Sequence, residues 1–172
     1  MKVHHFSSSS DKGGAARAAS RIHLALLDRG IESSMFVDSG ATSGNRIFSR
    51  ADMVQKLAVK GKARAANVLL KFLSTKNAEQ HSLSLFPSRW LRAINGSSAD
   101  VVHLHWVNRE MLSISDIGRI EKPVVWTLHD MWPFSGAEHL CQDRRWELGY
   151  EKDNRPDHER GLDLNRWVFQ RK

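Results

Sequence analysis

The chain has 172 residues, 41% of them hydrophobic, which suffices for one domain with a buried core but not for two domains of ordinary size. Its single cysteine, Cys141, excludes an intramolecular disulfide, and the start of the chain lacks the long apolar run of a signal peptide. Both features predict a cytoplasmic protein. The net charge of +7 favours an anionic partner, such as phosphate, nucleic acid or an acidic bilayer surface.

The first third of the chain predicts strand, helix, strand and a long basic helix. Residues 1–6 predict a strand, and apolar residues at helical spacing from Ala15 to Leu26 predict a helix that ends at Gly30. A short strand is expected at 34–37. The longest helical candidate is 51–74, in which Gly61 favours a kink or a split. Its apolar and basic residues are expected on different sides: Val54, Leu57, Ala65, Val68, Leu69 and Phe72 against Lys56, Lys60, Arg64 and Lys71.

The second half of the chain continues the alternation of helices and strands. A buried strand is expected at 100–106, a short helix at 113–120, another strand at 124–128, and a helix that begins near 163. This order predicts an α/β fold, with a Rossmann-like parallel sheet covered by helices on both faces.

The basic residues concentrate in one segment. Between 46 and 76 there are eight lysines and arginines against Asp52 alone, so this segment accounts for the whole charge excess. Lys56, Lys60, Arg64 and Lys71 form one stripe, which is either a solvated face or a surface for an anionic membrane. A nucleic-acid-binding module on this helix is a weaker alternative, because the segment has little aromatic interleaving and no reading motif.

Ligands of open α/β sheets bind at the carboxyl ends of the strands, so residues that follow the strands are the first candidates for a site. Gly13 and Gly14 follow the first strand, where they either let the backbone approach a phosphate or sugar oxygen or simply form a turn. His103 and His105 share one face of their strand. Either both are metal ligands, or His103 is a hydrogen-bonded core residue and only His105 lies near the strand end.

The third strand end leads into residues 127–139, which combine aromatic and titratable side chains. His129, Asp130, Glu138 and His139 can hydrogen-bond sugar hydroxyls, and Trp132 and Phe134 offer flat apolar faces. The loop is therefore predicted to hold a polar, ring-shaped ligand, with a loop packed by its own aromatics as the alternative.

Three motifs in order give the chain a family resemblance. They are KVHHFS with GGAARAA, then DVVHLHW, then KPVVWTLHDMWPFSG. Together they resemble the N-terminal half of group 1 (family 4 type) retaining glycosyltransferases of bacterial polysaccharide biosynthesis, which have the GT-B fold. The resemblance covers nearly the whole chain.

The resemblance implies a role for several residues. Gly13 and Gly14 would face the donor diphosphate and the transferred sugar, and His129 would lie at the reaction centre. Asp130 and Glu138 would shape the acceptor site, to which Trp132 and His105 are also assigned. The acceptor would be a saccharide or a polyprenyl-linked sugar, the latter at the inner face of the plasma membrane.

The resemblance also implies what the chain lacks. Enzymes of this family move a sugar from a nucleoside diphosphate sugar with retention, and they generally use neither a cofactor nor a bound metal. Their nucleotide-gripping residues lie in a C-terminal domain. Residues 1–172 are thus expected to be the single N-terminal, acceptor-side domain, inactive by itself.

A metal-dependent hydrolase is the main alternative from another class of enzyme. His103, His105, His129 and Asp130 are chemically able to hold Zn²⁺ or Mn²⁺ and to activate water.

Overall fold

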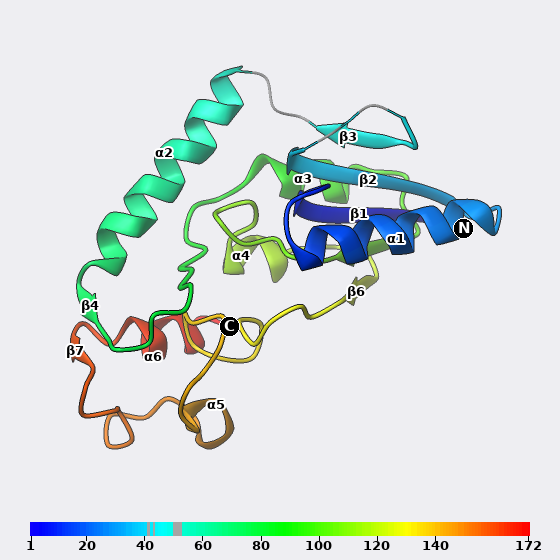
Figure 1. The fold of residues 1–172 in the computed structure, drawn as a ribbon. Coiled ribbons are helices and arrows are strands. Elements are labelled where there is room, and N and C mark those ends of the chain that lie inside the picture. The colour runs from blue at the N-terminus through cyan, green and yellow to red at the C-terminus, as the bar shows by residue number, and fades with distance from the viewer. Residues whose placement is uncertain (41, 43, 50–52) are drawn as a thin grey trace.

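The structure is a computed structural model that describes residues 1–40, 42, 44–49 and 53–172, with the backbone only for 53–56. Its centre is a five-stranded parallel sheet in the order β3-β2-β1-β5-β6 (Figure 1). The strands are β1 (Lys2–Ser9), β2 (Glu32–Ser39), β3 (Ile47–Ser49), β5 (Val101–Leu104) and β6 (Val124–Trp126). The predicted Rossmann-like α/β fold is therefore confirmed.

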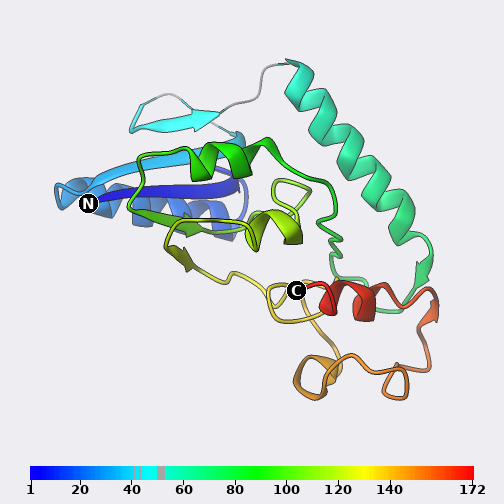
Figure 2. The same ribbon diagram turned by 180° about the vertical axis from the view of Figure 1, so that it is seen from behind.

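Helices cover both faces of this sheet. The helix α1 (Gly14–Asp28) lies on one face, and α3 (Arg89–Asn95) and α4 (Ile114–Ile117) lie on the other (Figures 1 and 2). The α3 side of the sheet holds the larger apolar core. Side chains on this face of β1 and β5, which are Phe6, Val102 and Leu104, pack with Trp90, Ile94, Met111 and Leu112. The side chains at the alternate positions of these strands point at α1. They include His5 and His103, which are paired in register on β1 and β5.

The predicted end of α1 is confirmed in detail. Gly30 has a φ of 71°, and its amide donates to the Leu27 carbonyl. The amide of Ile31 donates to the Leu26 carbonyl. This pair of hydrogen bonds satisfies carbonyls that the helix end leaves open. The turn directs the chain into β2, which begins two residues earlier than predicted, at Glu32.

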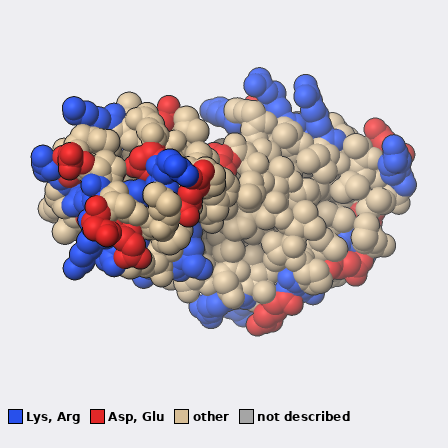
Figure 3. All heavy atoms as spheres, turned by 90° about the horizontal axis from the view of Figure 1, so that it is seen from below, with Lys and Arg blue, Asp and Glu red and all other residues tan. Residues whose placement is uncertain are grey.

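A second, smaller lobe packs beside the sheet and was not predicted. It contains the antiparallel pair β4 (Leu73–Ser74) and β7 (Arg160–Gly161), with α5 (Arg145–Leu148) and α6 (Leu164–Phe169). Figure 3 shows basic and acidic side chains mixed over this lobe, whereas the rest of that face has few charges away from its rim. Inside the lobe, buried Arg145 pairs with Glu159 at 3.4 Å and with Asp163 at 2.8 Å.

The long helix α2 (Met53–Leu70) differs from the prediction in its length and its packing. It ends at Leu70 and runs through Gly61 without a break, so Lys71 and Phe72 follow in a turn. Leu57 is 64% exposed and Val68 is 55% exposed. The apolar residues therefore do not form a buried side, because α2 leans away from the sheet (Figure 1).

The exposed face of α2 mixes apolar and basic residues. Positions 57, 60, 64 and 68 recur at helical spacing, so Leu57, Lys60, Arg64 and Val68 lie next to one another, and all four are exposed. The predicted separation into an apolar and a basic side was therefore wrong. The side chains of Val54 and Lys56 lie outside the described residues.

Three further elements are shorter than predicted. The strand expected at 100–106 is β5, which spans only Val101–Leu104. The helix expected at 113–120 is the single turn α4, and the strand expected at 124–128 ends at Trp126. Among the described residues, no helix has the length and apolar character needed to span a membrane.

Candidate functional site

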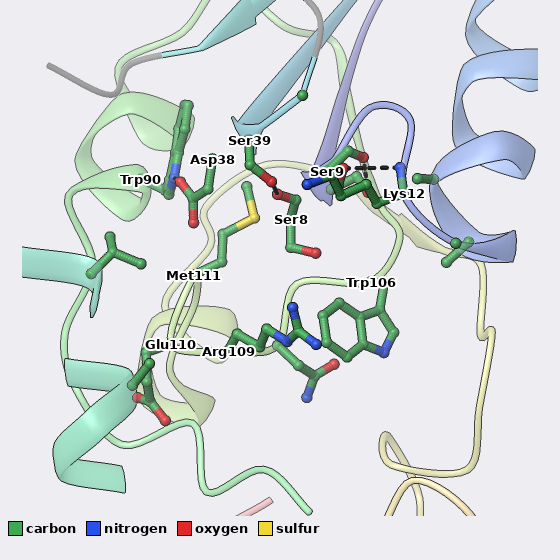
Figure 4. A pocket seen from close by; sticks show the side chains of 18 of the residues that line it. Ser8, Ser9, Lys12, Asp38, Ser39, Trp90, Trp106, Arg109, Glu110 and Met111 are labelled. Atoms are coloured by element: carbon green, nitrogen blue, oxygen red, sulfur yellow. Dashed lines mark hydrogen bonds between the residues drawn. The ribbon is translucent and has the colours of Figure 1, made fainter. Parts of the chain in front are cut away.

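A large cavity lies at the carboxyl ends of β1, β2 and β5. Its volume is about 1390 Å³, and it is bordered on one side by α2, from which Ala58, Val59, Lys60, Lys62 and Ala63 reach it. Figure 4 shows Ser8, Ser9 and Lys12 across the cavity from Trp106 and Arg109. This is where open parallel sheets bind ligands.

The turn after β1 supplies polar groups and backbone to the cavity wall. Gly13 has a φ of 92°, a conformation that residues with a side chain rarely adopt, and nothing lies within 4 Å of where its Cβ would be. Gly13 is also the N-cap of α1, and as a glycine it has no side chain with which to cap the amides there. Both Gly13 and Gly14 line the cavity, so amides at a helix N-terminus are available to an anionic ligand.

The residues after β5 were missed by sequence reasoning, although the rule that favours strand ends applied to them as well. The guanidinium of Arg109 lies 5.5 Å from the centre of the Trp106 ring, and both residues line the cavity. Arg109 and Glu110 have φ values of 56° and 63°. Two successive non-glycine residues in this region store strain, of about 1–3 kcal/mol each, and such strain is often found at ligand sites.

Two carboxyl groups at the cavity have a raised pKa. Asp38 accepts a hydrogen bond from the indole Nε1 of Trp90 at 2.7 Å, and Glu110 accepts from the amides of Leu85 and Phe86. In each case burial raises the pKa, and the hydrogen bonds only partly oppose it. Neither residue was predicted, because nothing in the local sequence shows that its carboxyl group is buried.

Three histidines form a row that ends at the cavity. Nδ1 of His5 lies 3.1 Å from Nε2 of His105, and Nδ1 of His105 lies 3.2 Å from Nε2 of His129. His5 and His105 are buried, whereas His129 is partly exposed and lines the cavity. The order β1-β5-β6 in the sheet brings these residues together, since each lies on or just after one of those strands.

Asp130 also lines the cavity, but its oxygens are already occupied. Oδ2 accepts hydrogen bonds from Trp106 Nε1 at 2.7 Å and His139 Nδ1 at 2.5 Å, and Oδ1 accepts from the amide of Trp132 at 3.1 Å. Burial alone would raise the pKa of Asp130, but the hydrogen bonds from His139 and Trp106 lower it below its usual value. Asp130 is thus a carboxylate that holds Trp106 and the 130–139 loop in place.

Trp132, Glu138 and His105, for which an acceptor role was predicted, do not line the cavity. Trp132 is 1% exposed, and its indole donates to the Ser82 carbonyl at 2.9 Å, with Lys172 over its ring. Glu138 is buried and accepts a hydrogen bond from the Tyr150 hydroxyl, and Cys141 Sγ lies 3.1 Å from Oε1 of Glu138. Trp132 and Glu138 hold the smaller lobe together instead of facing a ligand.

The histidines that come closest to a metal site are His5, His103 and His105. One ring nitrogen of each lies within 4.8 Å of the others, and all three residues are buried. This is not the predicted set, because His129 and Asp130 are not among the three. His103 Nε2 also lies 2.7 Å from Thr127 Oγ1, and none of the three rings lines the cavity. An ion there would be separate from the cavity, and water bound to it would not meet a ligand in the cavity.

Comparisons with known proteins give no match. No family model matches the chain, and neither a curated protein nor a solved structure is significantly similar to it.

Proposed function

We propose that residues 1–172 form the acceptor-side domain of a retaining glycosyltransferase with the GT-B fold, which moves a sugar from a nucleoside diphosphate sugar to a saccharide or lipid-linked acceptor. One observation carries the proposal. The loop with Gly13 and Gly14 and the residue His129, assigned to donor and reaction centre by the motif resemblance, line the same cavity although they are more than a hundred residues apart in sequence.

The chemistry of the cavity supports an anionic, polyhydroxylated ligand. Uncapped amides at the start of α1, together with Lys12 and Arg109, favour a diphosphate because they place positive charge and N–H donors on one site. Ser8 adds a hydroxyl group, and Trp106 adds a flat ring, both suited to a sugar. In a front-face transfer, a phosphate oxygen of the leaving group takes the acceptor proton, so the site needs no protein nucleophile.

The exposed face of α2 supports a lipid-linked acceptor. Leu57 and Val68 flank Lys60 and Arg64 there, so apolar groups and positive charges face outward together, which suits an anionic membrane surface. An adjoining side of α2 borders the cavity, through Ala58 and Val59, and Lys60 reaches the cavity from the edge of the exposed face. A membrane docked on α2 would therefore lie close to the site where a polyprenyl-linked acceptor must enter.

A metal-dependent hydrolase is the second candidate, and the cluster of His5, His103 and His105 is the observation that favours it. It has less support, since none of those rings lines the cavity.

A binding experiment on this chain separates the two candidates. Isotope-labelled protein is titrated with uridine and guanosine diphosphates, with their sugar conjugates, and with inorganic phosphate as a reference. We expect the conjugates to shift the resonances of residues 8–14 and of His129, and we expect no turnover by this domain alone. Hydrolysis of a phosphoester or an amide after addition of Zn²⁺ or Mn²⁺, without nucleotide-sugar binding, would favour the hydrolase.

Two glycine variants provide a matched comparison. Gly13→Ala and Gly30→Ala both place a side chain at a positive φ with open space around it, at opposite ends of α1. Gly13, with φ 92° and ψ 172°, is in a region almost restricted to glycine, so Gly13→Ala should lose about 1–3 kcal/mol of stability. Gly30→Ala should lose about 1–2 kcal/mol, because Gly30 is in the left-handed region. Only Gly13→Ala should weaken binding of the conjugates, because only Gly13 lines the cavity. Equal binding by both variants would contradict the assignment of the diphosphate to this loop.

A further inference from the structure

The row of His5, His105 and His129 connects the buried sheet with the cavity. His5 is 0% exposed and His105 is 2% exposed, and the next ring along, His129, is on the cavity wall. Neighbouring nitrogens in the row lie 3.1 Å and 3.2 Å apart, which is hydrogen-bond distance. Each contact therefore needs one protonated and one unprotonated nitrogen.

The buried rings of His5 and His105 have no carboxylate partner among the described residues, so a charge on either ring would be costly and both are neutral near pH 7. Burial, with smaller contributions from neighbouring histidines, lowers the pKa of His5 to about 3 and that of His105 to about 2. Burial also lowers the pKa of His129. Each ring then carries one proton, on either Nδ1 or Nε2.

With one proton on each ring, only two arrangements keep both hydrogen bonds. In the first, all three protons are on Nδ1, so that His5 donates to His105 and His105 donates to His129. In the second, all three are on Nε2 and both hydrogen bonds run the other way. The two arrangements differ at the ends of the row, at His5 Nε2 and His129 Nδ1.

The buried end of the row, at His5, decides between the two arrangements of protons. Nε2 of His5 is buried and has no hydrogen-bond partner among the described residues. In the second arrangement it would be an N–H donor without an acceptor, which costs about 1–3 kcal/mol and is rarely found in protein interiors. In the first arrangement it is a lone pair, and no buried donor in the row is left unsatisfied.

We propose that His5, His105 and His129 form a row with a fixed direction, in which all three protons are on Nδ1 and His129 offers an N–H donor to the cavity. His105 is then a positioning residue, because its Nδ1–H holds Nε2 of His129 as the acceptor. A ligand atom at His129 must itself be an acceptor, such as a phosphate or hydroxyl oxygen, and neutral His129 cannot take a proton from it through Nδ1. The nature of the ligand depends on the proposed function, but the direction of the row does not.

Nuclear magnetic resonance of the ring nitrogens tests the direction without any transfer of sugar. In ¹⁵N-labelled protein at pH 7.5, long-range proton–nitrogen spectra distinguish the protonated nitrogen of each ring, and His129→Gln identifies the signals of His129. We expect His129 to be protonated on Nδ1, the minor form of free neutral histidine. A proton on Nε2 of His129 would overturn the proposal, whatever the enzyme activity of the chain.

Two leucine variants show whether His105 fixes this state. In His105→Leu the donor to His129 Nε2 is gone, so the proton of His129 should move mainly to Nε2. His4→Leu is the control, since His4 is on the opposite face of β1, where its ring packs 5.0 Å from that of Phe36, and it should leave His129 unchanged. If His105→Leu does not fold, the spectrum of the unmodified chain still decides the direction. One equivalent of Zn²⁺ bound at His5 and His105 would also overturn the proposal, because the ion would replace the proton on His5 Nδ1.

Discussion

The carboxylate of Asp130 accepts a hydrogen bond from the indole of Trp106 at 2.7 Å, and this contact joins the segments that follow β5 and β6. Trp106 lies under the guanidinium of Arg109, so the contact also fixes one wall of the cavity. The same carboxylate oxygen accepts from His139. Asp130, which the sequence suggested as a ligand contact, therefore mainly holds Trp106 and His139 in place.

Loss of Asp130 should destabilise the domain. Asp130→Ala leaves Trp106 Nε1 and His139 Nδ1 without their acceptor, so we expect the free energy of unfolding to fall by about 1–3 kcal/mol. Asp100→Ala is the matched control, because Asp100 is exposed and its carboxylate has only exposed partners among the described residues, the amide of Lys2 and the N-terminal amine. Urea unfolding followed by tryptophan fluorescence measures both. A loss no larger than that of the control would show that Asp130 holds nothing in place.

Acid should destabilise the domain as the pH falls below 6.5, the ordinary pKa of histidine. The folded-state pKa values of His5 and His105 are about 3 and about 2, below the ordinary 6.5, so the unfolded chain binds protons first as the pH falls. The contribution of these rings is complete above pH 6.5 and is lost on acidification towards pH 3, by up to about 1.4 kcal/mol per pH unit for each ring. Urea midpoints at pH 7.5, 6 and 5 measure the slope, which His5→Gln should reduce. The same slope in that variant would mean that His5 is accessible to protons in the folded state.

Substitution of His129 should affect catalysis more than folding. Under the proposed function, His129→Ala in an active enzyme that contains this domain should lower kcat by about a hundredfold or more, because it removes a hydrogen bond to the reacting sugar or phosphate. Since His129 is partly exposed, the melting temperature should change by only a few degrees. Collapse of stability with normal turnover by the folded fraction would make His129 a packing residue.

The mixed face of α2 should bind anionic membranes. Lys60→Glu with Arg64→Glu reverses two charges between exposed Leu57 and Val68, and each basic residue near an anionic surface contributes about 1 kcal/mol. The control is Arg17→Glu with Arg21→Glu, which makes the same change at the same spacing on the exposed side of α1. Sedimentation with liposomes of graded anionic content should show binding that falls with salt, is lost in the α2 variant and persists in the control. Equal loss in both variants would mean that only net charge matters, and no binding at low salt would favour a soluble acceptor.

The sequence by itself determined the order of the elements and the type of fold. The alternation of apolar strands with amphipathic helices predicted the parallel sheet, because each segment must bury its apolar residues at its own periodicity, and Gly30 predicted the end of α1 because a left-handed residue there closes the helix. Gly13, Gly14, His129 and Asp130 were correctly predicted to follow strands, and all of them line the cavity.

Only the tertiary structure decided which side chains meet. Nothing in the sequence indicated a role for His5. The order β1-β5-β6 nevertheless brings its Nδ1 to within 3.1 Å of Nε2 of His105, which is 100 residues away in sequence. Trp132 and Glu138 resembled ligand contacts until packing placed them inside the smaller lobe. Local patterns state which groups a segment can offer, but the order of strands in the sheet and the burial of each side chain depend on contacts between distant segments, which no local pattern contains.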